Sequence, residues 1–318
     1  MNNRVRLVQA SIIVTIGILL SLITMYVPML SILSLLIPVP YAMISTLTNN
    51  KYSFLALVAT FFILIFMVNP LYSVSICVMS VLPGIAIGAM AKSHLNQGEV
   101  NKFEPLYAGT IVAVISTIIF GVIANIVFKT NIIENFTAII KESMNMQLEI
   151  IRSAGISLKQ DININMIVDF VTNLLPTILF LQAIIVAFIA YYVEVFILRR
   201  TRIANLPLPK FADFYLPGNA VTASLILYML VLFIDLIGIN IYTDLIMLNL
   251  QLVFNFMFMI QGISVCIHFF REWIKQGAVK MILTYSLILF IFGFMGISFI
   301  GMLDSIIDFR KVRSYKSI

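Results

Sequence analysis

The strongest constraint on the fold is a stretch of forty residues, Tyr52–Ala91, that contains no Lys, Arg, Asp, Glu or His. Its halves, Tyr52–Val68 and Tyr72–Met90, are each long enough to cross a hydrocarbon core of roughly 30 Å as a helix. Asn69-Pro70 separates them, since proline removes a backbone donor. Only helices or a closed barrel satisfy all backbone polar groups in lipid, and the halves lack the alternation of barrel strands. The sequence therefore predicts an all-α, polytopic helical membrane bundle.

The composition extends this prediction to nearly the whole chain. Hydrophobic residues make up 61% and charged residues 11% of the 318 residues, and the mean hydropathy is +1.07, whereas a soluble domain carries about 25% charged residues. We expect a single membrane domain over residues 1–318. It comprises a five-span part over 1–128, an extracytoplasmic segment over 129–165 and C-terminal spans over 166–318.

The net charge of +6 indicates orientation in the membrane and not binding to nucleic acid. Lys and Arg gather in alternate connections between spans, as the positive-inside rule describes. We therefore expect a plasma-membrane protein with a cytoplasmic N-terminus and the lipid bilayer as its partner. The basic residues of these connections are Arg4, Arg6, Lys51, Lys92, Lys102, Arg199, Arg200, Arg202, Lys210, Arg271, Lys275 and Lys280.

Eight apolar runs have the length of spans, and prolines lie inside three of them, with Pro83 in the fourth. Pro38-Val-Pro40 lies near the middle of the second run, and Pro176 lies in the sixth, which we expect to be tilted or kinked there. Two interpretations of Pro38-Val-Pro40 stay open: a kink packed against a neighbour, or a discontinuous helix at a binding site, as in transporters. The expected spans are 5–25, 28–47, 52–68, 72–90, 106–128, 166–198, 220–236 and 244–269.

The C-terminal end allows either one span over Met281–Leu303 or a hairpin of two short helices that turns near Gly293–Gly296. We favour the hairpin, because it returns a basic tail to the cytoplasmic side. That tail contains Arg310, Lys311, Arg313 and Lys316.

The connection over residues 129–165 is long and hydrophilic, and the charge pattern places it outside the cell. Its apolar residues recur at helical spacing opposite charged ones, which predicts an amphipathic helix across the outer mouth of the bundle, ended by Gly155. The apolar face comprises Ile132, Ile133, Phe136, Ile140, Met144, Leu148 and Ile151.

Polar side chains within the spans are the candidates for function, because lipid makes them costly. At about 100° per residue, Gln251 and Asn255 share one narrow face of their span. Tyr228 and Asn173 lie on similar faces of their own spans. Two interpretations stay open: hydrogen bonds between helices, or contact with a solute. The candidate ligand-binding residues are thus Gln251, Asn255, Tyr228 and Asn173.

Two further polar groups lie near the cytoplasmic ends of spans. Glu194 precedes Arg199 by about one helical turn, and we expect an ion pair between them. Gln261, Ser264 and His268 form a second, weaker polar cluster.

Two features offer surfaces for a cytoplasmic or membrane protein partner. Gly84 and Gly88 form a GxxxG pattern, which lets two helices approach closely, either within this chain or with a partner subunit. The stretch Leu206–Pro217 mixes aromatic residues with prolines and predicts an interfacial docking loop. The candidate docking residues are Gly84, Gly88, Pro209 and Phe214.

The sequence predicts no catalytic or metal site. It contains no HExxH, no GxSxG and no phosphate-binding glycine loop, and neither His94 nor His268 has a partner at metal-ligand spacing. Cys77 and Cys266 fall within spans, where we expect small apolar fillers. We therefore expect a protein that is not an enzyme and holds no metal or cofactor.

Short motifs in spans two to four and in the tail resemble the YybS-like family, polytopic membrane proteins of Gram-positive bacteria. The first five or six spans are also loosely similar to substrate-binding subunits of energy-coupling-factor vitamin transporters, although Ala10/Val14 and Ser11/Thr15 depart from the alanine pattern of their docking helix. The resemblance implies a solute-binding or transport-related subunit of a bacterial plasma membrane. The alternative is a scaffold protein of the envelope. The motifs are Pro38-Val-Pro40-Tyr-Ala-Met, Thr48-Asn-Asn-Lys51, Leu82-Pro-Gly-Ile-Ala-Ile-Gly88, Gln261-Gly262, Gly301-Met-Leu-Asp304 and Asp308-Phe-Arg-Lys311.

Overall fold

The computed structural model describes residues 3–96, 101–153, 163–216, 219–239, 242–270, 293 and 295–312. Within these ranges the chain is helical with short connections and no strand, which confirms the predicted all-α fold. Seven described helices are long and apolar enough to cross a membrane, and Ala220–Leu236 and Met295–Ile307 are shorter apolar helices. The chain forms two compact units, an N-terminal unit (Met1–Leu208) and a C-terminal unit (Pro209–Ile318). The expected subdivision at residues 128 and 165 stays a prediction.

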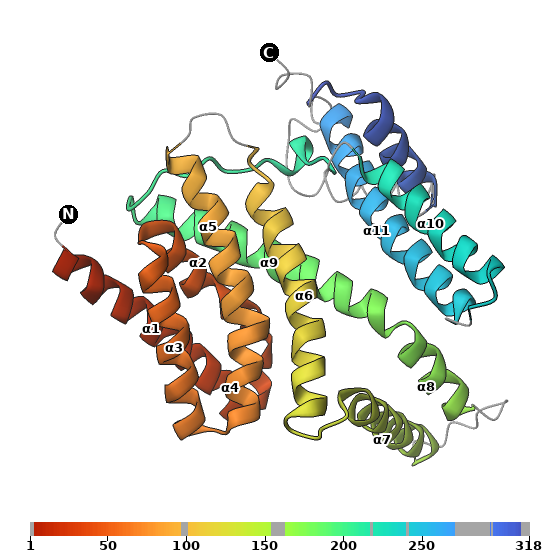
Figure 1. The fold of residues 1–318 in the computed structure, drawn as a ribbon, viewed down its shortest axis with the longest axis horizontal. Coiled ribbons are helices and arrows are strands. Elements are labelled where there is room, and N and C mark those ends of the chain that lie inside the picture. Colours follow the sequence, from red (N-terminus) through yellow and green to blue (C-terminus); the bar gives the residue numbers. More distant parts are fainter. Residues whose placement is uncertain are drawn as a thin grey trace. The chain divides into compact units, whose positions relative to one another are not determined.

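The N-terminal unit holds six of these seven candidate spans (Figure 1). The second span combines a 3-10 helix with an α-helix, and the fourth contains a π-helical turn. In order, the spans are α1 (Asn3–Tyr26), η1 (Pro28–Leu36) with α2 (Pro38–Leu47), α3 (Asn50–Met67), α4 (Pro70–Ile76) with η2 (Cys77–Val81) and α5 (Leu82–Asn96), α6 (Glu104–Ile126), and α9 (Leu175–Arg200).

Helix α6 buries small residues and exposes large apolar ones. Helix α6 buries Gly109 and Ala113 but exposes Ile111, Ile115 and Ile118 by 50–64%. Small residues let helices pack closely in lipid, whereas large apolar side chains suit contact with acyl chains. This pattern agrees with direct contact between the helices and a bilayer.

Helices α2 and α5 pack closely because of two glycines. A Cβ atom on Gly84 would overlap the carbonyl oxygen of Pro38, and one on Gly88 would overlap that of Ala42. The GxxxG pattern thus serves packing within the chain, one of the two uses expected of it. Because α2 also packs on α9, α2 occupies the centre of the N-terminal unit.

Prolines mark the breaks in two of the predicted spans. Pro38 opens α2 directly after the 3-10 helix η1, because proline is tolerated in the first turn of a helix. The expected single helix over 166–198 is instead two, α8 (Ile164–Asn173) and α9, separated at Leu174. Pro176 lies in the first turn of α9, and its nitrogen cannot donate the hydrogen bond to the carbonyl of Thr172 that a continuous helix would need. The chain therefore starts a new helix there.

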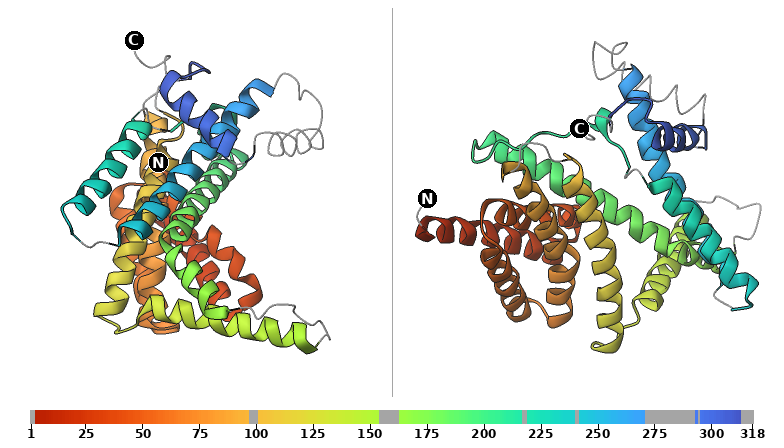
Figure 2. Two further views of the ribbon diagram at one scale, coloured as in Figure 1. Left: turned by 90° about the vertical axis from the view of Figure 1, so that its right-hand side faces the viewer. Right: turned by 45° about the horizontal axis from the view of Figure 1, so that its top comes forward.

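Helix α7 (Ile132–Ser153) confirms the helix predicted in the long connection. It runs crosswise to α6 (Figures 1 and 2) and packs on α8. Gly155, its predicted end, lies outside the described residues. Six residues of the predicted apolar face are half-buried: Ile132, Phe136, Ile140, Met144, Leu148 and Ile151.

The C-terminal unit contains the short 3-10 turn η3 (Phe211–Asp213), α10 (Ala220–Leu236), α11 (Thr243–Phe270) and the helix Met295–Ile307. Figure 2 shows the last of these, in dark blue, beside α11. The first half of the expected C-terminal hairpin lies outside the described residues. Gly293 has a φ of +61°, which glycine adopts readily, and the hairpin stays a prediction.

The helix Met295–Ile307 approaches α11 closely through two glycines from the tail motifs. A Cβ atom on Gly262 would overlap the carbonyl oxygen of Ile297, and one on Gly301 would overlap that of Phe258. The motifs Gln261-Gly262 and Gly301–Asp304 therefore meet at one helix crossing.

Candidate functional site

Two irregular helical segments of the N-terminal unit lie beside a cavity. One is the 3-10 helix η1, and the other is the π turn η2, which ends two residues before Pro83. In an α-helix the nitrogen of Pro83 would have to donate a hydrogen bond to the carbonyl of Met79, but proline has no N–H. The wider π turn relieves this conflict, and such turns are frequent at functional sites.

Residues of η1, α4, η2, α6 and α9 line a cavity of about 160 Å³. Liquid water takes about 30 Å³ per molecule, so the cavity has room for about five waters or one small solute. The lining contains no ionisable side chain. Its polar members are Ser34, Ser75, Ser80, Thr117 and Gln182.

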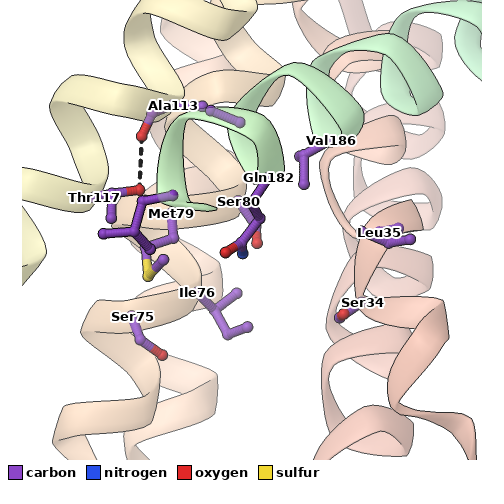
Figure 3. Close-up of a pocket in the computed structure, with 12 residues that line it drawn as sticks. Ser34, Leu35, Ser75, Ile76, Met79, Ser80, Ala113, Thr117, Gln182 and Val186 are labelled. Carbon is purple, nitrogen blue, oxygen red and sulfur yellow. Dashed lines mark hydrogen bonds between the residues drawn. The ribbon is translucent and has the colours of Figure 1, made fainter. Parts of the chain in front are cut away.

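Two of these five side chains already use their hydroxyl hydrogen. Thr117 Oγ1 donates to the carbonyl of Ala113 at 2.9 Å (Figure 3), and Ser75 Oγ donates to the carbonyl of Tyr72 at 2.7 Å. Their hydroxyl oxygens still offer acceptor lone pairs toward the cavity.

The other three side chains have unused hydrogen-bonding groups. Ser34, Ser80 and Gln182 make no side-chain hydrogen bond to any residue that the structure describes. In Figure 3 the Gln182 side chain points from α9 into the cavity, on the side of Ser80. Ser80 is half-buried, whereas Ser34 and Gln182 are exposed at the open side of the cavity. Their unused groups are available to a polar ligand or to water.

Three of the four predicted ligand-binding residues lie together in the C-terminal unit. Tyr228, Gln251 and Asn255 line a groove of about 350 Å³ between α10, α11 and the helix Met295–Ile307. Asn173 is exposed at the end of α8, in the N-terminal unit, and does not line this groove. The predicted ligand-binding role of all four residues stays a prediction.

The groove in the C-terminal unit is more apolar than the cavity in the N-terminal unit. Its wall includes an aromatic row in which the Tyr228 and Phe254 rings are 6.0 Å apart and the Phe254 and Phe258 rings 6.4 Å apart. Ser298 Oγ donates to the backbone carbonyl of Asn255 at 3.0 Å, and Gln251 is exposed. Within this groove the Ser298 hydroxyl is thus engaged in a hydrogen bond, whereas the Gln251 side chain is open to the surroundings.

A buried polar cluster in the C-terminal unit joins two residues of the second predicted polar cluster, Gln261 and Ser264, to two partners that helical spacing did not identify. Arg310 Nη2 and Asp304 Oδ2 form an ion pair at 2.7 Å, with the two side chains 0% and 1% exposed. Gln261 Nε2 also donates to Asp304 Oδ2, at 2.8 Å, and Arg310 Nη1 donates to Ser264 Oγ at 2.7 Å. Arg310, which the sequence analysis assigned to the basic tail, is thus buried in the unit. The cytoplasmic side of the tail stays a prediction.

The same cluster fixes the backbone of the loop around η3. Arg310 donates to the carbonyls of Ala212 and Phe214, both at 2.8 Å. Gln261 Oε1 accepts a hydrogen bond from the backbone nitrogen of Leu216 at 3.0 Å. The sequence signals for this arrangement were the helical spacing of Gln261 and Ser264 and the tail motifs quoted for the family resemblance.

All four predicted docking residues are buried. Gly84 and Gly88 face α2, as described above. Phe214 stacks on Phe211 with ring centroids 5.9 Å apart. Pro209 opens the same loop.

The expected ion pair between Glu194 and Arg199 is wrong. Glu194 is completely buried and contacts Thr46 of α2, whereas Arg199 is exposed. Within the described ranges the ion pair is that of Arg310 and Asp304. The alanines before Glu194 allow α2, α6 and α9 to pack closely, and this packing encloses the carboxyl group between helices.

The fold defines a polytopic helical membrane protein with polar groups enclosed between its spans. Residues 15–305 match the model of a family described as "Predicted membrane protein (DUF2232)". Because this match covers most of the chain, the protein belongs to that family. Comparison with curated proteins and with solved structures finds no match.

Proposed function

We propose that this protein binds a small, neutral, polar solute in the cavity of its N-terminal unit, as a transport-related subunit of a bacterial plasma membrane. The observation that carries the proposal is the set of unused hydrogen-bonding groups on Ser34, Ser80 and Gln182 around a cavity of about 160 Å³. A lining without ionisable side chains favours a neutral solute, because a buried charge needs a compensating partner. The proposed role is binding and not catalysis.

The position of the cavity supports a transport-related role. It lies beside a 3-10 helix, a π turn and the break before Pro176, and transporters bind substrates at discontinuous helices. The proposed likeness to substrate-binding subunits of energy-coupling-factor transporters rests on the same part of the chain. The proposed likeness to YybS-like proteins rests on this part and on the tail motifs. The proposed orientation, with a cytoplasmic N-terminus and α7 outside, follows from the distribution of Lys and Arg.

The alternative, an envelope scaffold that holds protein partners, receives less support. Its proposed contacts were Gly84, Gly88, Pro209 and Phe214, and all four are buried. A scaffold would need exposed surface at these positions, whereas Gly84 and Gly88 pack on α2 and Phe214 stacks on Phe211.

Native mass spectrometry of the full-length protein, extracted in mild detergent from the native host, tests the proposed function. We expect a small neutral molecule bound to the wild type and three- to tenfold lower occupancy in Gln182→Leu, since a lost hydrogen bond costs about 0.5–1.5 kcal/mol. Gln251→Leu, in the groove of the other unit, is the matched control and should retain the adduct. An adduct lost only in Gln251→Leu would assign binding to the groove, and a wild type without adduct would contradict the proposal.

A further inference from the structure

Three helices of the N-terminal unit meet at a buried hydroxyl group. Thr46 of α2 is 2% exposed, and its Oγ1 lies 3.1 Å from the carbonyl oxygen of Gly88 in α5. The same Oγ1 is in hydrogen-bond contact with Oε1 of Glu194 in α9, whose exposure is 0%. The other carboxyl oxygen, Oε2, has no hydrogen-bond partner among the described residues.

The number of hydrogens at this junction decides which group donates. A threonine hydroxyl carries one hydrogen and can also accept. If Thr46 donates to the carbonyl of Gly88, the hydrogen in the contact with Glu194 has to come from the carboxyl group. If Thr46 donates to Glu194 instead, the carbonyl of Gly88 loses the hydroxyl as a partner, and a buried carboxylate retains a single donor.

The second arrangement is the more costly one. Burying an ionised carboxylate without a paired charge costs several kcal/mol, and here one of its two oxygens would have no donor at all. Burial of a neutral carboxyl group costs far less free energy, because Oε2 is then an uncharged carbonyl oxygen without a partner.

We propose that Glu194 is a proton-binding site at the junction of α2, α5 and α9. Its carboxyl group holds a proton on Oε1 and donates it to Thr46 Oγ1, and Thr46 donates its own hydrogen to the carbonyl of Gly88. Release of the proton leaves an unpaired charge at the junction, so release requires water or another donor to reach Glu194. The proton is therefore linked to the packing of α2 and α5 against α9.

The ionisable side chains around this junction provide no charge pair for Glu194. Tyr41 of α2 shares a hydrogen bond with Thr60, Lys92 of α5 donates to the carbonyl of Thr48, and Tyr191 of α9 donates to the carbonyl of Lys102. The side chain of His94 lies outside the described residues. The remaining ionisable residues of α6 and α9 are Glu104, Tyr107, Tyr192, Arg199 and Arg200, and no salt bridge joins any of these described residues to Glu194.

Infrared spectroscopy of the full-length protein in lipid tests the inference without any solute. A protonated carboxyl group has a C=O stretching band that is distinct from the bands of ionised carboxylates. At pH 7 we expect this band in the wild type, its loss in Glu194→Gln and its retention in Glu142→Gln, which changes an exposed acid of α7. In Thr46→Val the band should shift, because its hydrogen-bond acceptor is removed.

Two outcomes would overturn the inference. One is a wild-type spectrum at pH 7 without any protonated-carboxyl band, which needs no variant and is unaffected by a folding defect. The other is a band that stays unchanged in a folded Glu194→Gln protein. Neither outcome bears on solute binding in the cavity, so the two proposals fail separately.

Discussion

Arg310 connects three segments of the C-terminal unit that are far apart in sequence. Its guanidinium group contacts Asp304 on the helix Met295–Ile307, Ser264 on α11, and the carbonyls of Ala212 and Phe214 in the loop. Planar, multiply bonded contacts of this kind suit arginine better than lysine. The cluster therefore sets how the loop lies against α11.

Removal of the Arg310 charge should destabilise the C-terminal unit strongly. Arg310→Met leaves Asp304 buried without its counter-charge, a change that typically costs about 3–5 kcal/mol. Thermal unfolding in detergent should show a clearly lower midpoint, while the control Lys210→Met, at an exposed loop position, should leave it unchanged. The unfolding midpoint of the double variant Asp304→Leu/Arg310→Met should fall less than that of Arg310→Met alone. Equal midpoints for Arg310→Met and the wild type would exclude a stabilising role of the Arg310 charge.

Helical periodicity predicted part of the polar arrangement at the residue scale. It placed Gln251, Asn255 and Tyr228 on inward faces, and the structure brings them to one groove. It missed the contact of Arg310 with Asp304 and with the loop, because periodicity along one helix contains no information about partners from distant segments. The positive-inside rule predicts only the side of the membrane on which Arg310 lies, and it contains no information about burial within the unit.

At the scale of elements, the close pair of α2 and α5 organises the N-terminal unit. Gly84 and Gly88 bring the two backbones together, and Ser45 Oγ adds a hydrogen bond to the carbonyl of Ile85 at 2.9 Å. The sequence predicted close packing at the GxxxG pattern, but it did not identify α2 as the partner.

A single methyl group at Gly84 should separate these helices. Gly84→Ala would drive a Cβ atom into the carbonyl of Pro38, and overpacking of this kind costs about 1–3 kcal/mol. Gly121→Ala in α6 is the control, because nothing lies within 4 Å of its added Cβ and alanine is the better helix former. The midpoint of thermal unfolding should fall for Gly84→Ala and stay unchanged or rise for Gly121→Ala. The reverse order would contradict the close contact of α2 and α5 at Gly84.

Proline positions predicted the broken helices only in part. Pro38 and Pro40 indicated an interruption in the second span, and α2 does begin there. The π turn before Pro83 was not predicted, since the sequence does not distinguish a kinked α-helix from a widened turn. Pro176 was expected to kink a helix, but it begins one.

At the scale of the whole molecule, apolar runs and charge placement predicted the membrane class and most of the spans. They did not predict the two compact units or the cavity, because both depend on which helices become neighbours. The family match over residues 15–305 agrees with the membrane class.

The proposed orientation predicts the labelling of two introduced cysteines. Glu142→Cys on α7 should react with a membrane-impermeant maleimide in intact cells, and Lys51→Cys should react only after permeabilisation. Both positions are exposed, whereas the natural Cys77 and Cys266 are buried and should contribute little background. Labelling of Lys51→Cys but not Glu142→Cys in intact cells would reverse the orientation.

A density map of the protein purified in lipid from its native host tests the central claim most directly. We predict density for a compact non-protein molecule between η1, η2, α6 and α9, within hydrogen-bond distance of Gln182 and of Ser80 or Ser34. A cavity closed by its own side chains, or filled by a lipid acyl chain that makes no polar contact, would contradict the account.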